Sequence, residues 1–176
     1  MDIVFLDIDG VLNNYNSTHN DSTHNKSPQG FIGVEDKYLH RLNTIIVCTG
    51  AEIVLVSDWK DCWDKDVEHC NPDGEYLNRR FKEHEIKITD KTDDKSRGND
   101  WSSGRGYGIK KYLEENEGIE QYVILDDVLF SDYDKELRKH LVLTDNGITD
   151  DDVEVAVNIL MGKLLDDNYS LMRKDL

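Results

Sequence analysis

Two aspartates stand at the end of an apolar run near the start of the chain, in the stretch FLDIDGVLN. Asp7 and Asp9 are two residues apart, and side chains at positions i and i+2 of a β-strand point to the same side. If the apolar run is a strand, both carboxyl groups lie together beside the hydrophobic core, where like charges repel each other. Two arrangements relieve this repulsion: some of the carboxyl groups are protonated, or a cation binds them.

The elements that must hold these acids follow from the spacing of apolar residues. Short apolar runs predict strands at residues 2–7, 52–57, 86–88, 122–127 and 140–144. Helical spacing predicts helices at residues 34–48, 59–70, 75–84, 108–116 and 132–140, and a last helix that Thr149 caps. A turn at Asn71-Pro72-Asp73-Gly74 separates the second and third of these helices. Strands that alternate with helices indicate an α/β fold with a five-stranded parallel sheet.

Polar side chains follow three of the predicted strands. Asp7 and Asp9 end the first strand, Ser57 ends the second, and Asp126 and Asp127 end the fourth. Ligands of open parallel sheets bind outside the carboxyl ends of the strands, so we expect these residues to converge on one site. Asp7, Asp126 and Asp127, with Asp9 contributing a backbone carbonyl, would form a set of hard oxygen donors that favours Mg²⁺.

Composition limits the partners and the compartment. A chain of 176 residues suits one domain with a real hydrophobic core. Its formal net charge of -16 repels phosphate backbones and argues against a non-specific nucleic-acid binder. Its apolar runs fall far short of the ~20 residues that a membrane span needs, so no membrane partner is expected. The start MDIVFLD does not resemble a signal peptide, and the odd count of three cysteines indicates reduced thiols in a cytoplasmic protein.

The ordered motifs resemble those of the haloacid dehalogenase-like (HAD) superfamily of phosphatases. DIDGV follows the first predicted strand, Ser57 ends the second, a basic residue precedes a helix, and ILDD ends the fourth. The closer similarity is to the HAD domain found in Swiss-army-knife RNA-repair proteins, and it rests on FLDIDGVLN, EIVLVSDWK, RGYGIKKYL, YVILDD and HLVLTDNGITDDDVEVAVNIL. The resemblance implies a Rossmann-like three-layer sandwich with a minimal cap, folded as a single domain over residues 1–176.

The resemblance also implies a chemistry for the acids. Asp7 would be the nucleophile that forms an aspartyl-phosphate intermediate, and Asp9 the general acid and then the general base. Ser57 would hold a phosphoryl oxygen through its hydroxyl. Asp126 would bind Mg²⁺ directly, and Asp127 would bind it through water or orient a neighbouring side chain.

A fixed positive charge should neutralise the transferring phosphoryl group. Arg105 is the favoured candidate because it stands where the family places its third motif, just before the predicted helix, and Lys110 is the second choice. Lys111 is interpreted as part of a solvated helix face. Asp58 and Lys60 depart from the residues that the family usually has after the second strand, and both remain candidates for phosphate binding.

Two polar loops, residues 14–33 and 90–104, are predicted to act as lids over a fairly open site. The second loop contains Trp101 among basic residues, which would either stack a base or stay solvated.

The leading hypothesis is a Mg²⁺-dependent phosphatase of a nucleotide or another small phosphorylated metabolite. A phosphatase that acts on a polynucleotide 3′ or 5′ end fits the resemblance, but the negative net charge of the chain disfavours it. A non-catalytic binding or regulatory module is the alternative of another class, and the sequence does not determine the oligomeric state.

Overall fold

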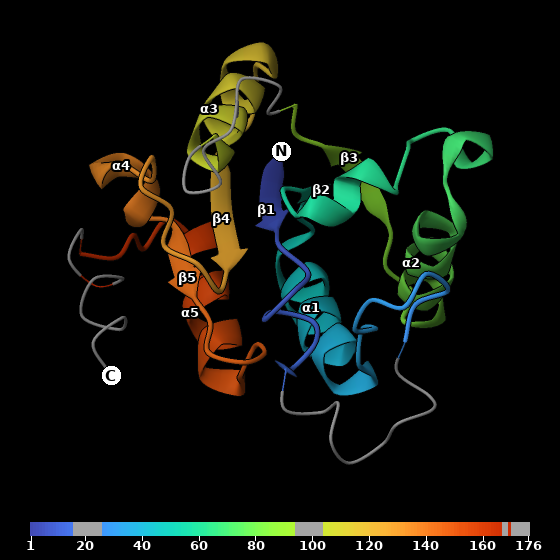
Figure 1. Ribbon diagram of the computed structural model, residues 1–176. Helices are drawn as coiled ribbons and strands as arrows, with labels where there is room; N and C mark the ends of the chain where they lie inside the picture. Colours follow the sequence, from blue (N-terminus) through green and yellow to red (C-terminus); the bar gives the residue numbers. More distant parts are fainter. Residues whose placement is uncertain (16–25, 94–103, 167–168, 170–176) are drawn as a thin grey trace.

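Five parallel strands form the centre of the computed structural model, which describes residues 1–15, 26–93, 104–166 and 169 (Figure 1). The strands are β1 (Asp2–Leu6), β2 (Glu52–Leu55), β3 (Ile88–Lys91), β4 (Gln121–Asp126) and β5 (Leu141–Leu143). Their order across the sheet is β3-β2-β1-β4-β5, and each neighbouring pair is parallel. The predicted α/β fold with a five-stranded parallel sheet is therefore confirmed.

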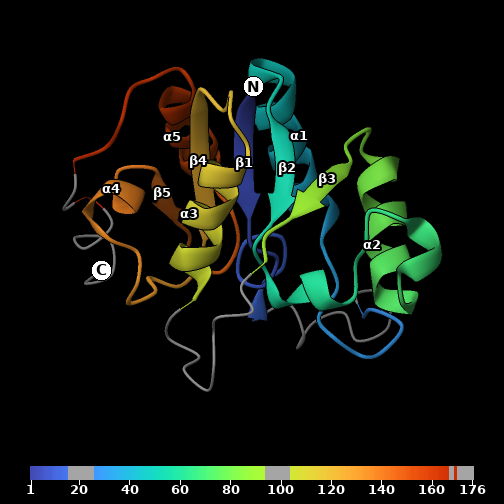
Figure 2. The same cartoon turned by 90° about the horizontal axis from the view of Figure 1, so that it is seen from above.

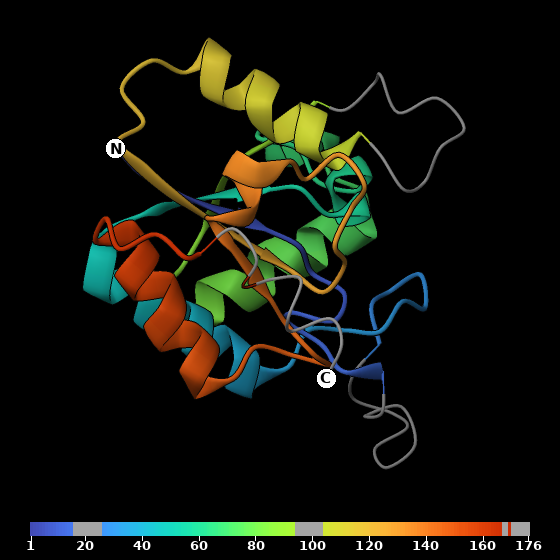
Figure 3. The same ribbon diagram turned by 90° about the vertical axis from the view of Figure 1, so that its left-hand side faces the viewer.

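Helices cover both faces of the sheet and give three layers (Figure 3). One face carries α1 (Asp36–Thr49), α2 (Pro72–Glu83) and α5 (Asp150–Leu160), and the other carries α3 (Arg105–Glu115) and α4 (Lys135–Arg138). Successive residues of β1 alternate between the two cores, with Val4 and Leu6 in the first and Ile3 and Phe5 in the second. Because both faces are buried, the strands are nearly continuous apolar runs in the sequence.

Two helix ends are set by residues that the sequence identifies. Gly50 ends α1 in the left-handed conformation, and its backbone N–H donates to the Ile46 carbonyl. Thr149 begins α5 with a capping box, in which Asp152 accepts a hydrogen bond from the Thr149 backbone. Both ends therefore follow from local hydrogen bonding rather than from long-range packing.

Residues 59–70 differ from their prediction as one helix. They contain two separate 3₁₀ helices, η2 (Asp58–Asp61) and η3 (Val67–His69), which the side chains of Ser57 and Asp66 cap. Trp59 and Trp63 are both buried and lie one helical turn apart in the sequence, which explains the helical pattern.

The start of α2 is a second correction. Asn71 caps α2 and Pro72 occupies its first turn, so the Asn-Pro-Asp-Gly stretch begins a helix instead of forming a turn between helices. Other boundaries also differ, most clearly in three elements: the third strand starts at Ile88 and runs to Lys91, α3 starts at Arg105, and α4 spans only Lys135–Arg138.

The carboxyl ends of the strands lie at one edge of the sheet, where η2, the start of α3 and the segment 26–35 also gather (Figure 2). The chain leaves β1 first for β2 on one side and later for β4 on the other, which makes this edge a topological switch point. Residues 26–32 of the first predicted lid form a small hairpin closed by a bridge between Lys26 and Ile32. Residues 16–25 and 94–103, including Trp101, lie outside the described residues, so the lid function of both loops stays a prediction.

Within the part of the chain that the structure describes, none of the helices combines the length and the apolar character needed to cross a bilayer.

Candidate active site

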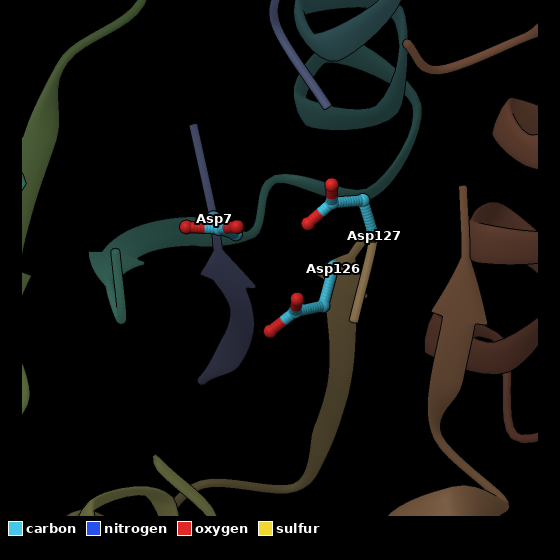
Figure 4. Close-up of side chains that lie close together, drawn as sticks. All are labelled: Asp7, Asp126 and Asp127. Atoms are coloured by element: carbon cyan, nitrogen blue, oxygen red, sulfur yellow. The ribbon is translucent and has the colours of Figure 1, made fainter. Parts of the chain in front are cut away.

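Three carboxyl groups meet between the tips of β1 and β4 (Figure 4). Leu6 pairs with Leu125 across the two strands, and the Asp7 backbone N–H donates to the Leu125 carbonyl at 2.9 Å. This register sets Asp7 beside Asp126, and carboxylate oxygens of Asp7, Asp126 and Asp127 all lie within 4.8 Å of one another. Asp7 and Asp126 are buried and Asp127 is half-buried. The three side chains could therefore hold a metal ion.

Burial and mutual repulsion weaken the acidity of two of these groups. Burial raises the pKa of Asp126 to about 6, although Arg105 acts against the shift. Burial, and then the charges of Asp7 and Asp126, raise the pKa of Asp127 to about 7. A divalent cation would remove this repulsion, and three carboxylate oxygens are donors that suit Mg²⁺. The donor set therefore fits the metal that the sequence predicts.

Arg105 is a cation that reaches this cluster. Its Nη1 lies 3.2 Å from Oδ2 of Asp7 and 2.9 Å from Oδ2 of Asp126. The guanidinium also lies over the Phe130 ring, 4.3 Å from its centroid. Burial alone would lower the pKa of Arg105, but Asp126 and Asp7 together raise it well above its usual value. Arg105 therefore stays charged. The sequence predicts that it precedes the helix, whereas the structure places it at the first residue of α3.

Lys110 and Lys111 point to other partners. The Nζ of Lys110 pairs with the exposed carboxylate of Asp134, and that of Lys111 pairs with Asp93. The structure thus does not bring Lys110 to the acidic cluster. Of the two preferred candidates for the phosphate-binding cation, Arg105 is the one that the geometry supports.

Asp9 lies beside the cluster rather than in it. The Trp59 indole Nε1 donates to Oδ2 of Asp9 at 3.0 Å, and the Asn13 Nδ2 donates to Oδ1 at 2.7 Å. Burial raises the pKa of Asp9, although these two hydrogen bonds lower it, and the charge of Asp7 raises it further. A carboxyl group that is fixed in place and has a raised pKa suits general acid–base catalysis. The metal contact through the Asp9 backbone carbonyl stays a prediction.

Gly10 makes room for Asp127. Its φ of 71° falls in the left-handed region, and a Cβ at this position would lie 2.1 Å from Oδ2 of Asp127. The Gly10 carbonyl accepts hydrogen bonds from the Thr144 hydroxyl at 2.9 Å and from the Gly147 backbone N–H at 2.7 Å. The turn after β1 is thereby tied to the loop after β5, and the Asp127 carboxyl group packs directly against it.

The second motif lies at the end of β2, next to β1. Ser57 is fully buried, and its hydroxyl oxygen accepts a hydrogen bond from the Trp59 backbone N–H at 3.4 Å. Lys60 is also buried, and its Nζ donates to a backbone carbonyl four residues earlier at 3.4 Å. Asp58 is exposed, with its Oδ1 4.0 Å from Nη2 of Arg105. Phosphate binding by these three residues stays a prediction.

Three residues that position the acids are not identified from the sequence: Asn13, Trp59 and Tyr133. Asn13 stands in the first motif, but its function depends on the folded turn, where its Oδ1 accepts from the Gly10 backbone N–H at 2.8 Å. The Tyr133 hydroxyl donates to Oδ2 of Asp126 at 2.7 Å; the sequence places Tyr133 in the predicted helix 132–140, whereas in the structure it precedes α4. Trp59 stands in the second motif, but the sequence predicts for it only the start of a helix.

A comparison with known protein families resolves what this arrangement is. Residues 3–153 match the family described as the HAD domain in Swiss Army Knife RNA repair proteins. The chain belongs to this family. The match runs from β1 into the first turn of α5 and so includes all four acids of the site. The HAD resemblance found in the sequence is thereby confirmed.

Membership in the HAD family indicates phosphohydrolase-type chemistry but does not specify a substrate. A comparison with curated proteins finds no match to this HAD domain.

Proposed function

We propose that this HAD domain is a Mg²⁺-dependent phosphohydrolase that forms an aspartyl-phosphate on Asp7. The position of Asp7 carries the proposal: it is a buried carboxylate at a strand tip, in contact with the Arg105 guanidinium and close to two further acids. Arg105 supplies fixed positive charge to the phosphoryl oxygens. Bound Mg²⁺, held by Asp7, Asp126 and Asp127, would neutralise the charge of the carboxylates and of the phosphoryl group.

In the first half of the reaction, a carboxylate oxygen of Asp7 attacks phosphorus. The bond between phosphorus and the leaving oxygen breaks, and Asp9 gives its proton to that oxygen. The raised pKa of Asp9 keeps this proton available, and the hydrogen bonds from Trp59 and Asn13 fix the direction of the carboxyl group. The leaving alcohol departs neutral, and the phosphoryl group stays on Asp7.

In the second half, Asp9 is ionised and accepts a proton from water. The water oxygen attacks phosphorus, the bond between phosphorus and Asp7 breaks, and inorganic phosphate leaves. Both aspartates return to their starting states. One carboxyl group therefore serves as acid and then as base, which is the reason that it must lie beside the nucleophile and outside the metal-binding cluster.

A nucleotide or another small phosphorylated metabolite is the proposed substrate. The family description names RNA repair, which favours the 3′ or 5′ phosphate of a polynucleotide as a second candidate. The formal net charge of -16 disfavours an extended phosphate backbone, because each added phosphate increases the long-range repulsion.

The proposal is tested by turnover of p-nitrophenyl phosphate in Mg²⁺ and in excess chelator. We expect hydrolysis that requires the metal and that is lost in Asp7→Asn, whereas Asp151→Asn, at an exposed position of α5, keeps it. Wild-type protein without turnover of this ester, of nucleoside monophosphates or of phosphorylated oligonucleotides would instead favour a non-catalytic binding module.

A further inference from the structure

Two large aromatic side chains are left half exposed close to the acids. Tyr15 is 49% exposed and Phe31 is 51% exposed. They stand on either side of residues 16–25, in the insertion between β1 and α1. Single exposed apolar residues are ordinary on protein surfaces, so the location of these two rings, and not their exposure, calls for an explanation.

Phe31 packs against Trp59, next to Asp9, the proposed general acid. Its ring centroid lies 5.5 Å from that of Trp59, and the Trp59 indole donates to Asp9. A single side chain therefore separates the exposed Phe31 ring from the group that would protonate the leaving oxygen.

The hairpin that carries Phe31 is closed by an internal hydrogen bond and is held to the rest of the fold by two others. The Phe31 backbone N–H donates to the Ser27 hydroxyl at 3.1 Å, and the Gln29 backbone N–H donates to the buried Asp73 carboxylate at 3.0 Å. Asn13, which also binds Asp9, donates to the Ile32 carbonyl at 3.1 Å. The Phe31 ring is thus a preorganised surface rather than a loosely placed side chain.

Tyr15 approaches the same acids from the turn after β1. The preceding residue, Asn14, donates to the Tyr38 hydroxyl at 3.3 Å, and that hydroxyl donates to the Asn146 carbonyl at 3.1 Å. Burial, and then the negative charges of the four acids of the site, raise the pKa of Tyr15 to about 12. Asn13, two residues before Tyr15, donates to the Asp9 carboxylate at 2.7 Å, so the half-exposed Tyr15 ring follows directly from the turn that holds the proposed general acid.

We propose that the substrate is a nucleoside monophosphate whose base packs against Phe31 and Tyr15 while its phosphate lies at Asp7. Every base has a π-face, so aromatic rings at the rim bind a base without requiring a particular hydrogen-bond pattern. A single phosphate monoester carries little charge compared with a polynucleotide, which accords with the acidic surface. This inference rests on the proposed function, and it adds the class of leaving group and the residues that recognise it.

The experiment compares a nucleoside 5′-monophosphate with ribose 5-phosphate, which has the same ester but no base. We expect wild type to prefer the nucleotide, and Phe31→Ala to lower kcat/KM for the nucleotide about tenfold, the order of one base–aromatic stack, mainly through KM. Hydrolysis of ribose 5-phosphate should change little. Tyr15→Ala should act in the same way, and Phe31→Tyr and Tyr15→Phe, which keep the rings, should restore the preference.

The matched control is Val47→Ala, which removes an apolar side chain from an exposed position of α1 that is 75% exposed. It should leave both substrates unaffected. Equal rates of hydrolysis of the two substrates by wild type would overturn the inference. So would an equal loss on both substrates in Phe31→Ala, because that result would mean that Phe31 only supports Trp59 and Asp9.

A binding measurement separates this inference from the proposed function. Calorimetric titration of Asp7→Asn with the two ligands in Mg²⁺ measures recognition of the base without turnover. Tighter binding of the nucleotide, lost on adding Phe31→Ala, supports base recognition even if wild type hydrolyses nothing. Equal affinity for both ligands overturns it even if wild type is an active phosphatase.

Discussion

Replacing Arg105 with alanine removes a positive charge that two buried acids share. Asp126 is completely buried, and Nη1 of Arg105 lies 2.9 Å from its Oδ2 and 3.2 Å from that of Asp7. Breaking a buried ion pair by removing one partner costs ~3–5 kcal/mol of unfolding free energy. Asp126 keeps hydrogen bonds from the Tyr133 hydroxyl and the Val128 backbone N–H, so we expect a loss of about 3 kcal/mol, at the lower end of this range.

The loss should depend on pH. The pKa of Asp126 is about 6 with Arg105 present, and it should rise further in the variant because the opposing positive charge is gone. Protonation then removes the unpaired charge at acidic pH. The destabilisation should therefore be largest at about pH 8 and clearly smaller at about pH 5.

Urea unfolding of the metal-free protein, followed by circular dichroism at both pH values, measures this effect. Arg41→Ala is the matched control, because Arg41 forms an ion pair with the exposed Asp150, which solvent screens. It should cost much less and vary little with pH. A loss below about 1 kcal/mol in Arg105→Ala at pH 8, or equal losses at both pH values, would refute the buried charge network described for this site.

Three other perturbations have expected outcomes. Gly10→Ala should cost ~1–3 kcal/mol and abolish turnover, because the new Cβ strains a left-handed backbone and displaces the packed carboxyl group; normal activity would contradict this contact. Asp126 and Asp127 have pKa values of about 6 and about 7, above the ordinary 3.8, so the folded metal-free protein binds more protons than the unfolded chain. Its stability should fall as the pH rises from about 4 to about 7, and Mg²⁺ should stabilise it more at the higher pH; thermal melts with and without the metal check both signs. Trp59→Phe removes a hydrogen bond that lowers the pKa of Asp9, the proposed general acid. We therefore expect kcat to fall roughly tenfold or more and the Asp9 limb of the pH–rate profile to move to higher pH. Trp63→Phe, which removes a hydrogen bond to Asn78, should leave the profile in place.

The sheet and its acidic edge were predictable because strands buried on both faces are continuous apolar runs with a clear end. Asp7 and Asp126 follow two such runs, and the rule that ligands bind at the carboxyl ends brings them together. Residues 59–70 were not predictable in the same way. Trp59 and Trp63 have the spacing of a helix face, but the Ser57 and Asp66 side chains each begin a separate short helix, and only the fold decides between these patterns.

The supports of the site could not be predicted from spacing. Trp59 and Asp9 are 50 residues apart, and their hydrogen bond exists only because β2 lies beside β1. Only the order of the family motifs favours Arg105 over Lys110 in the sequence, since both side chains stand on one helix and only its packing buries one of them. Long-range contacts therefore determine which polar residues are functional, whereas local patterns locate the acids.

Detection of a phosphoryl group on Asp7 tests the proposed mechanism without an intermediate inference. Protein mixed with p-nitrophenyl phosphate and Mg²⁺ is quenched in acid, digested, and mapped by mass spectrometry. We expect the peptide with Asp7 to gain the mass of one phosphoryl group, to gain more of it in Asp9→Asn, whose second step lacks its base, and to gain none in Asp7→Asn. Wild-type protein that hydrolyses the ester while Asp7 stays unmodified in both wild type and Asp9→Asn, or that has the phosphoryl group on another residue, would rule out Asp7 as the nucleophile.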